Sequence, residues 1–394
     1  MTGPLLGIRV LDITQYQSGP FCGQILADMG AEVIKVENPK GDIARRIAPY
    51  TNGESLFFAM YNRNKKSITL NLRQPEGVSI FKRLAEKADV VLENFRPGVM
   101  AAIGIDYERL SQRNPGLIMV SISGFGQQGP NAKRAAFDMV VQAMGGVMSL
   151  NGEPDGPPLK SAISVGDYSG GFYATIGTLL ALFHRQRTGQ GQSVDVALLD
   201  STVSLLEYFV SEYLALGSVP PRTGNRRTST YPNNIYRASD GYVYIAAGPY
   251  ELWARLARAI CREDLLADPR FIEGPQRAAY AHVLDEAVEA WTSQRSLAEI
   301  DKVFQQAGVP YGPVRGIPEV ATDPSLRERQ MIVEVEHPIA GKIPLLGTPI
   351  KLSHTPGGVE QAHPTLGQHN QEIYGGLLGL TVEELATLRN QGAL

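Results

Sequence analysis

The sequence predicts an α/β protein built on a parallel sheet, and two observations lead to that prediction. Short apolar runs alternate with helical stretches through the first half of the chain, and a strand, a crossover helix and a second strand form a right-handed parallel unit. Of the 394 residues, 43% are apolar, and the net charge is −3. This balance excludes general disorder and supplies one large core or two smaller ones.

The first strand–helix–strand unit opens the chain. Residues 8–13 form an apolar run, and residues 20–29 have helical spacing with Pro20 near the first position. Gly30 then precedes a second apolar run at 33–36. Proline at the start and glycine after the end are typical of a helix. The alternation continues with strands expected at 67–72, 89–92, 117–122 and 193–197, and helices expected at 75–87, 169–187 and 198–216.

The composition changes after residue 217. Residues 218–234 are rich in proline, arginine, asparagine and threonine, which indicates a linker or a functional loop. A second compact region is expected to follow, opening with a hairpin over 235–247 that turns at Asp240-Gly241. The other elements expected are helices at 251–260, 280–293 and 296–307, a loop at 310–318, a strand pair at 331–352 and a helix at 381–390.

Composition and motif content exclude several functional classes. The 37 basic residues against 40 acidic ones disfavour nucleic acid, which needs a concentrated basic surface. The chain contains no CxxC or HExxH motif and its six histidines are scattered, so we expect no metal site. Only Cys22 and Cys261 are present, with no signal-peptide pattern. No apolar run reaches the roughly 20 residues of a membrane span, so we expect a cytoplasmic protein without a membrane segment.

Polar residues follow two of the expected strands, at the edge where α/β sheets bind nucleotides. Residues 14–20 (TQYQSGP) contain one glycine, so they lack the GxGxxG pattern of a dinucleotide site, and an ordinary turn explains them equally well. Residues 93–98 (ENFRPG) offer an amide, an aromatic ring and a guanidinium, which suit a base, a thioester arm and a phosphate. A plain loop explains the Pro-Gly pair, but it explains the Asn-Phe pair less well.

Asp167 lies between a short apolar run and a helix rich in small residues, and this position allows two roles. Aspartate commonly caps a helix N-terminus, and a carboxylate can also act as a nucleophile that forms a covalent intermediate. The two roles are compatible. A helix N-terminus stabilises an ionised carboxylate by roughly 0.3–1 kcal/mol, so we expect Asp167 to be charged at neutral pH.

Six segments in order resemble the class III coenzyme A transferases, the family of formyl-CoA transferase and carnitine CoA-transferase. They are QYQSGPFCGQILADMGAEVIKVE, NRNKKSITLNL, ENFRPG, SISGFGQQGP, VGDYSGG and TGQGQSVDVALLDS, and the likeness is strongest over roughly residues 5–260. The resemblance implies that CoA moves from an acyl-CoA such as succinyl-CoA to a small or dicarboxylic acid. Asp167 would attack the thioester, form a mixed anhydride and then carry CoA as an aspartyl thioester.

The resemblance also implies which residues meet CoA, without a metal or NAD. Gln17 is implied as a second catalytic residue that contacts the acyl oxygen. The residues implied to bind CoA are Tyr16, Gln17, Leu70, Arg73, Asn94, Phe95 and Arg96. This chain has Asn38 and Ala102 where the family has arginines. The alternatives to Arg96 for the phosphates are Lys40, Lys133 and Arg134. The family's glycine loop over the active site is reduced to residues 246–249 (AAGP).

A basic cluster in the expected linker is a candidate for binding the substrate carboxylate. Its members are Arg222, Arg226, Arg227 and Tyr231. A guanidinium pairs well with a carboxylate, although a solvated linker explains the same residues. Asp138 is a further candidate that contacts substrate or orients a loop, and its alternative role is a helix cap.

The α-methylacyl-CoA racemases of the same superfamily abstract an α-proton with a histidine that precedes an aspartate. Here that segment reads Ala136-Phe137-Asp138, and phenylalanine cannot accept a proton. The sequence therefore favours a transferase over a racemase. The missing GxGxxG disfavours an NAD-dependent oxidoreductase, and the surroundings of Asp167 disfavour a non-catalytic CoA-binding protein.

The resemblance implies an interlocked homodimer in which each chain forms a ring threaded by its partner. A Rossmann-like large domain is implied from residues 1–217 and 319–394, and a smaller α+β domain from residues 225–318. Linkers are expected near 218–230 and 308–330. The active site is implied to lie between the large domain of one subunit and the small domain of the other.

Overall fold

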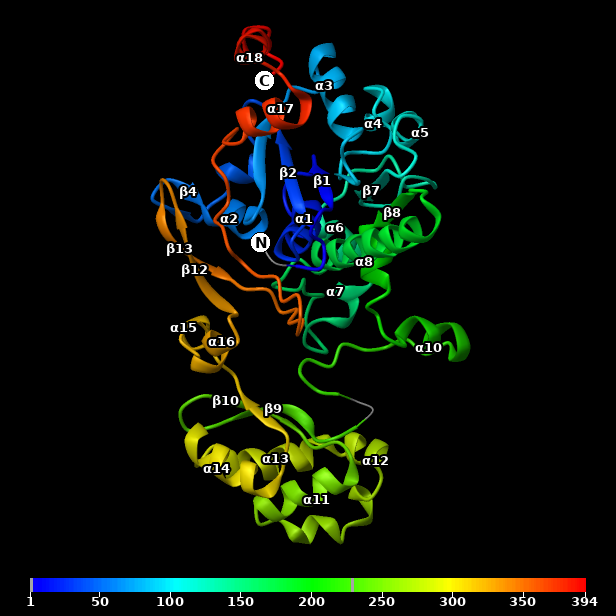
Figure 1. Cartoon of the computed structure of the whole chain (residues 1–394). Helices are drawn as coiled ribbons and strands as arrows, with labels where there is room; N and C mark the ends of the chain where they lie inside the picture. Colours follow the sequence, from blue (N-terminus) through cyan, green and yellow to red (C-terminus); the bar gives the residue numbers. More distant parts are fainter. Residues whose placement is uncertain (1–2, 228–229) are drawn as a thin grey trace. The chain divides into compact units, whose positions relative to one another are not determined.

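The computed structural model describes residues 3–227 and 230–394 (Figure 1). Their contacts group them into two compact units. The larger unit comprises Met1–Val147, Lys160–Tyr208 and Pro324–Leu394, and the smaller one comprises Met148–Leu159 and Phe209–Asp323. The larger unit is therefore assembled from segments far apart in the sequence, and the chain leaves it twice.

The larger unit is built on a six-stranded sheet in the order β5-β2-β1-β6-β7-β8, in which every neighbouring pair is parallel. The strands are β1 Arg9–Asp12, β2 Glu32–Glu37, β5 Lys66–Thr69, β6 Val90–Glu93, β7 Ile118–Ser123 and β8 Ser193–Ala197. The prediction of a parallel α/β sheet is thus confirmed. The strand order reverses between β1 and β6, and ligands of such sheets bind beyond the carboxyl ends of the strands at this switch point.

Helices cover both faces of this sheet, because alternate residues of a strand point to opposite faces. Val10 of β1 belongs to the same core as Leu26 and Ala174. Leu11 belongs to the core on the other face, with Phe81 and Tyr374. The helices that supply these layers are α1 Ser18–Asp28 and α8 Val165–Thr188 on the first face, and α3 Pro75–Ala85, α17 Asn370–Leu378 and α18 Val382–Asn390 on the second.

Two buried lysines hold the turn that joins β1 to α1. Lys65 Nζ lies 2.8 Å from an Asp12 carboxylate oxygen and also donates to the Pro20 carbonyl. Lys35 Nζ donates to the Thr14 carbonyl at 2.7 Å. Because buried charged groups are costly unless they are paired and hydrogen-bonded, these contacts fix both ends of the turn.

The smaller unit contains an antiparallel sheet in the order β11-β10-β9. Its elements are β9 Asn233–Arg237, β10 Tyr242–Ala246, β11 Tyr311–Pro313, α10 Phe209–Leu216, α11 Tyr250–Ala259, α12 Gly274–Ala279, α13 Ala281–Thr292, α14 Leu297–Ala307 and α15 Ile317–Ala321. The predicted hairpin is confirmed, since β9 and β10 pair across Asp240-Gly241. The predicted loop at 310–318 is wrong in part, because its first residues pair with β10 as a third strand.

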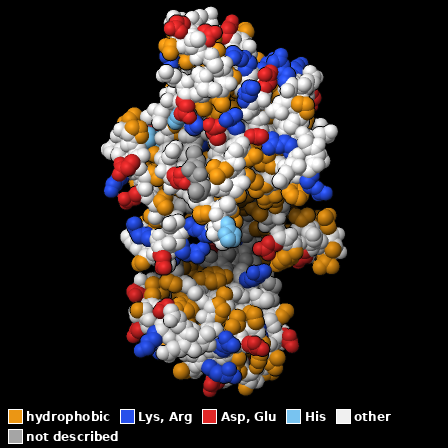
Figure 2. Space-filling view, viewed as in Figure 1, with side chains coloured by type: hydrophobic (Ala, Val, Ile, Leu, Met, Phe, Trp, Pro, Cys, Tyr) orange, Lys and Arg blue, Asp and Glu red, His pale blue; other side chains and the backbone are white. Residues whose placement is uncertain are grey.

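The helix expected over 198–216 is broken. It forms α9 (Leu198–Val203) and α10, and Glu207 between them lies in the left-handed region at φ 48°. This conformation belongs to turns rather than to helices. None of the residues of α10 is buried, and apolar side chains such as Leu214 cover its surface (Figure 2).

The remaining elements are short. They are β3 Tyr50–Thr51, β4 Glu54–Ser55, α2 Leu56–Asn62, α4 Val99–Ala102, α5 Tyr107–Ser111, α6 Asp138–Met144, α7 Val147–Leu150, α16 Pro324–Glu328, β12 Ile332–His337, β13 Gly341–Leu346, and 3₁₀ turns at Ile43–Arg46, Glu263–Leu266 and Pro269–Phe271. The antiparallel pairing of β12 with β13 confirms the strand pair predicted within 331–352. In the described part of the chain, no helix has the length and apolar character needed to cross a membrane.

Candidate active site

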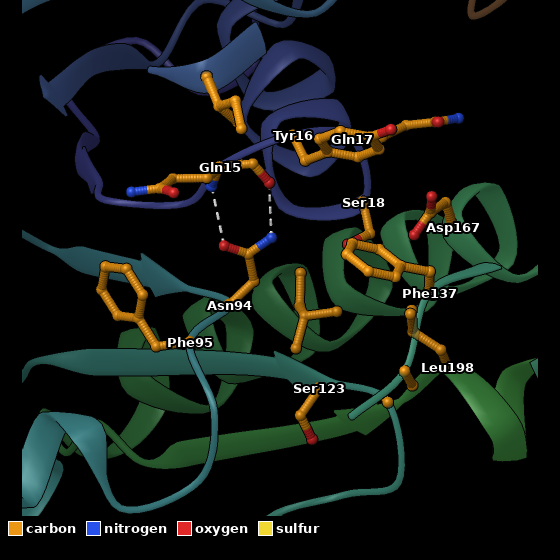
Figure 3. A pocket seen from close by; sticks show the side chains of 14 residues that line it. Gln15, Tyr16, Gln17, Ser18, Asn94, Phe95, Ser123, Phe137, Asp167 and Leu198 are labelled. Atoms are coloured by element: carbon orange, nitrogen blue, oxygen red, sulfur yellow. Dashed lines mark hydrogen bonds between the residues drawn. The ribbon is translucent and has the colours of Figure 1, made fainter. Parts of the chain in front are cut away.

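Two loops meet at the switch point of the sheet, one after β1 and one after β6. The Gln15 amide donates to Asn94 Oδ1 at 2.8 Å, and Asn94 Nδ2 donates to the Gln15 carbonyl at 2.7 Å (Figure 3). Asn94 therefore shapes the site by fixing the turn after β1. A direct contact from Asn94 to CoA stays a prediction.

A cavity of about 350 Å³ opens beside these loops (Figure 3). Its lining residues are Gln15, Tyr16, Gln17, Ser18, Ile43, Asn94, Phe95, Ile122, Ser123, Gly124, Ala136, Phe137, Asp167 and Leu198. The fold thus brings Tyr16, Gln17, Phe95 and Asp167 to one site from three separate motifs. No lysine or arginine is among these lining residues, so a carboxylate here has no cationic partner in the cavity wall.

A second cavity of about 470 Å³ adjoins the first, because Gln15 and Phe95 line both. Its other lining residues are Ile13, Val36, Asn38, Leu70, Leu72, Arg73, Val99 and Ile103. The predicted Leu70 and Arg73 therefore lie in this neighbouring, largely apolar cavity rather than beside Asp167. The predicted Arg96 lines neither cavity.

Asp167 lies in the first turn of α8 and is 8% exposed. The expected helix cap is wrong for this residue, because the cap position is Ser164 and Asp138 supplies the acceptor instead. Asp138 Oδ1 accepts from the backbone amides of Gly166 at 2.7 Å and Asp167 at 3.3 Å. Gln142 Nε2 holds the other Asp138 oxygen at 2.6 Å. The Asp167 carboxyl group is therefore not consumed by capping and remains directed to the cavity.

The environment of Asp167 opposes its ionisation. Burial, together with the nearby negative charge of Asp138, raises the pKa of Asp167 to about 7, against a smaller opposite effect of a hydrogen bond from Ser18. The helix N-terminus therefore keeps Asp167 only partly charged at neutral pH, because the loss of solvation outweighs the helix dipole. An ionised carboxylate without a cation is poorly stabilised and is accordingly the more reactive nucleophile.

Gln17 is buried and immediately precedes α1, where its carbonyl accepts from the Phe21 amide. Tyr16 is partly exposed and has a backbone φ of 72°. Its ring contacts the rings of Phe57 and Phe137, with centroids 5.5 and 6.1 Å away. The turn thus presents one amide and one aromatic ring to the cavity.

Some residues that line the cavity were not predicted from the sequence as site residues. Ser18 and Ser123 line the cavity and fall within the quoted segments QYQSGP and SISGFG, so motif membership was the available signal. Ile43 reaches the cavity from a 3₁₀ turn and had no local signal. Glu93, the first residue of the quoted ENFRPG segment, lines neither of these cavities; its buried carboxyl accepts from the Phe95 amide at 2.8 Å, and burial raises its pKa to about 7.

The basic cluster predicted to bind a substrate carboxylate is engaged inside the smaller unit. Arg226 donates to Asp285 Oδ2 at 2.9 Å, and Tyr231 also donates to Asp285. Arg222 donates to backbone carbonyls, including that of Glu153 at 3.2 Å. Arg222, Arg226 and Tyr231 are thus tied to other parts of the smaller unit rather than forming a solvated linker, and their contact with a substrate carboxylate stays a prediction. The third arginine, Arg227, is exposed.

Two of the histidines are not scattered in the fold. The rings of His337 and His363 stack with centroids 4.2 Å apart, and Glu54 lies 3.1 Å from His363 Nε2. His337 Nδ1 accepts two backbone amides, so its Nε2 carries the ring proton and has no lone pair for a metal. The lone pairs of an imidazole lie in its ring plane, so two nearly parallel stacked rings do not aim them at one ion. The group of three therefore does not fit a metal site.

An open parallel sheet with a cavity at its switch point, and a buried carboxylate with no cation among the described lining residues, define an α/β enzyme site. A family model described as CoA-transferase family III matches residues 5–370. The chain belongs to this family, which confirms the resemblance read from the sequence, and it is a CoA-transferase.

Relatives that are named as CoA-transferases align with nearly the whole chain. The chain is 43% identical over 389 residues to a succinyl-CoA--D-citramalate CoA-transferase of Chloroflexus aurantiacus, covering 98% of this chain and 97% of the relative. It is 38% identical to a succinate--glutarate CoA-transferase of Agrobacterium fabrum, covering 98% of each. A crystal structure of a CaiB/BaiF family protein from Brucella suis superposes with a TM-score of 0.86 at 37% identity, covering 96% of this chain and 100% of that one.

Proposed function

We propose that this protein transfers CoA from an acyl-CoA, such as succinyl-CoA, to a small or dicarboxylic acid through a thioester on Asp167. The observation that carries the proposal is the Asp167 carboxyl itself. It is the one carboxyl among the residues that line the larger unit's switch-point cavity, and capping is performed for it by Asp138.

The proposed reaction conserves the thioester through two exchanges. An Asp167 carboxylate oxygen attacks the donor thioester carbonyl, and the C–S bond breaks to give a mixed anhydride and the CoA thiolate. The thiolate then attacks the Asp167 carbonyl, which releases the donor carboxylate and leaves an aspartyl-CoA thioester. The acceptor carboxylate reverses these two steps, so that acceptor-CoA leaves and the Asp167 carboxylate is regenerated.

The two adjoining cavities suggest how CoA lies on the protein. The acyl end occupies the cavity of Asp167, where Gln17 and Tyr16 flank the thioester. The adenosine end lies in the second cavity, whose apolar wall includes Leu70. The exposed Arg73 lines that cavity, which supports a contact with a phosphate. Phe95 lines both cavities, which supports a position between the two ends of CoA.

The substrate class is supported by the names of relatives, which pair succinyl-CoA or succinate with dicarboxylic acids. A second carboxylate needs a cation, and the cavity of Asp167 has none among its lining residues. We propose that another part of an interlocked homodimer supplies it. The exposed apolar side chains of Phe172, Ile176 and Leu180 on α8 support burial against a second copy.

The domain limits, the homodimer and the cytoplasmic location belong to this proposal. In it, residues 1–217 and 319–394 form the large domain and residues 225–318 the small one. The two units support a large domain made from both ends of the chain, since the chain enters the smaller unit at Phe209 and returns at Pro324; residues 148–159 differ from the proposal, because they group with the smaller unit.

An α-proton mechanism is less compatible with the site. The position preceding Asp138 is Phe137, which lines the cavity and cannot take a proton. None of the cavity's lining residues is a histidine.

A panel of carboxylic acids mixed with succinyl-CoA tests the proposal. We expect new acyl-CoA to form with at least one small or dicarboxylic acid, and Asp167→Ala to abolish the exchange while remaining folded. Absence of exchange with every acid, or an active Asp167→Ala variant, would contradict it. Deuterium exchange at the α-carbon without exchange of acids would indicate a racemase instead.

A further inference from the structure

The chemistry proposed for Asp167 requires protection of its acyl intermediate from water, and the inference below rests on that proposed function. Water oxygen can attack the acyl carbonyl of the mixed anhydride, break its C–O bond and release the donor acid together with the Asp167 carboxylate. The CoA thiolate then takes a proton and leaves as free thiol. The net result is hydrolysis of acyl-CoA, so productive transfer depends on the exclusion of water.

The residues at 246–249 are fixed within the smaller unit rather than free to cover a site. Ala247 is fully buried, and its amide donates to the Pro232 carbonyl at 2.7 Å. The Gly248 carbonyl accepts from Arg277 at 2.5 Å. A movable cover made from this segment would break the core and these hydrogen bonds.

Three aromatic rings in contact instead reach the cavity of Asp167, each from a different segment of the larger unit; two of them line it, and Phe57 packs behind Tyr16. Tyr16 comes from the turn after β1, Phe57 from α2 and Phe137 from the residue preceding α6. The Tyr16 ring lies between the other two, 5.5 Å from Phe57 and 6.1 Å from Phe137. Tyr16 and Phe137 also line the cavity together with Asp167 (Figure 3).

The exposure of these rings is unusual for their type and position. Phe137 is 70% exposed and Tyr16 is 39% exposed, although both adjoin a carboxyl that is almost completely buried. Burial of a phenylalanine side chain is worth about 1.5–3 kcal/mol, so a ligand that covers the Phe137 ring gains this free energy. The exposed rings therefore form an apolar surface that a bound acyl thioester would cover.

The backbone of Tyr16 shows that the position of its ring is imposed. A φ of 72° is disfavoured for a residue with a side chain. The neighbouring contacts hold it there, since Asn94 binds both backbone groups of Gln15 and Lys35 binds the Thr14 carbonyl. The turn is thus braced in a conformation that places the ring against Phe57 and Phe137.

We propose that Tyr16, Phe57 and Phe137 form an aromatic rim that excludes water from the acyl-Asp167 anhydride and so sets the ratio of transfer to hydrolysis. The rim residues do not exchange protons with the substrate. Phe137 has the largest role, because it is the most exposed of the three and lies nearest in sequence to Asp138, which caps the nucleophile's helix.

The test measures two products of the same enzyme. Succinyl-CoA is supplied with and without an acceptor acid in water enriched in oxygen-18, and acceptor-CoA, free thiol and labelled succinate are quantified. We expect Phe137→Ala to raise the ratio of hydrolysis to transfer about tenfold or more. A small change in the activation free energy of hydrolysis relative to that of transfer produces this factor. Phe137→Leu, which keeps apolar bulk, is expected to restore most of the wild-type ratio.

Ile339→Ala is the matched control, since Ile339 is 60% exposed in the same unit and outside the cavity. Its ratio is expected to equal that of the wild type. If the Phe137→Ala enzyme still transfers CoA and its ratio of hydrolysis to transfer equals that of the wild type, the aromatic rim does not exclude water and the proposal is wrong. A wild-type enzyme that transfers no CoA to any acid would overturn the proposed function, and the rim with it.

Discussion

Asp167 and Asp285 are two carboxylates in opposite situations. Asp167 is buried, has no cation among the described residues that line its cavity and has a neighbouring carboxylate, Asp138, so its pKa is raised to about 7. Asp285 accepts from Arg226, two tyrosine hydroxyls and an asparagine amide. A carboxylate with few partners, such as Asp167, remains available for chemistry, whereas one with many partners, such as Asp285, serves structure.

Replacement of the two carboxylates is expected to differ most in its effect on the rate of CoA transfer. Asp167→Asn removes the nucleophile, so transfer from succinyl-CoA should fall by about 10⁴-fold or more. Asp285→Asn keeps an acceptor oxygen for Arg226 and should retain activity within about tenfold. Initial rates of the two variants at saturating donor measure this contrast. An Asp285 variant with the greater loss would reverse the comparison.

Above neutral pH, Asp167→Asn should stabilise the folded protein. Asp167 has a folded pKa of about 7, above the ordinary value of 3.8, so the native state is favoured while the group is protonated. This stabilisation is complete below pH 4, is lost as the pH rises to 7 and is absent above that. Asp167→Asn avoids the loss and should stabilise the protein at pH 8 by up to about 4 kcal/mol.

Urea unfolding of the Asp167→Asn variant and the wild type between pH 4 and 8 tests this sign. Because burial also raises the pKa of Glu93 to about 7, the same comparison in a Glu93→Gln background isolates Asp167. A stability difference that does not grow between pH 4 and 7 would show that Asp167 is not desolvated as described.

Removal of the Asp285 side chain should destabilise the smaller unit. Asp285→Ala leaves Arg226 unpaired and the buried hydroxyls of Tyr231 and Tyr236 without this acceptor. We expect a loss of about 2–4 kcal/mol, measured by urea unfolding with limited proteolysis to locate it. A stable Asp285→Ala protein with impaired substrate binding would instead support the substrate role predicted for Arg226 and Tyr231.

A smaller effect is expected from the charge beside the nucleophile. Asp138→Asn keeps a cap acceptor for the Gly166 amide and removes the negative charge that raises the pKa of Asp167. The groups that face Asp167 in the described structure are Asp138, Ser18 and Tyr61. The acid limb of kcat/KM for the donor should therefore move about half a unit to one unit lower in pH, and an unmoved limb would remove Asp138 from this role.

The sequence predicted the sheet and the site loops because their signals are local. Apolar runs predicted all six parallel strands, although the end residues of the strands differ. The turn at 14–20 and the loop at 93–98 lie at the switch point of the sheet, where ligands bind. Asp167 was a candidate from its place near the start of a helix rich in small residues, and the family resemblance singled it out as the proposed nucleophile. These features depend on the order of residues along the chain.

The features that the sequence missed depend on contacts between distant residues. The cap on α8 comes from Asp138, 29 residues before Asp167, and the raised pKa follows from burial that local spacing does not encode. The sequence does not show that Arg226 pairs with Asp285, because the two residues are 59 positions apart and only the fold brings them together. The break in the helix expected at 198–216 occurs at Glu207, where the apolar spacing continues without interruption.

Trapping of the covalent intermediate tests the central claim most directly. The enzyme is mixed with succinyl-CoA, quenched with hydroxylamine or borohydride, digested and analysed by mass spectrometry, with Asp167→Asn as the matched control. The proposed chemistry predicts modification of the peptide that carries Asp167 and none in the variant. A wild-type enzyme that exchanges CoA while its Asp167 peptide remains unmodified, or carries its modification at another residue, would contradict the account.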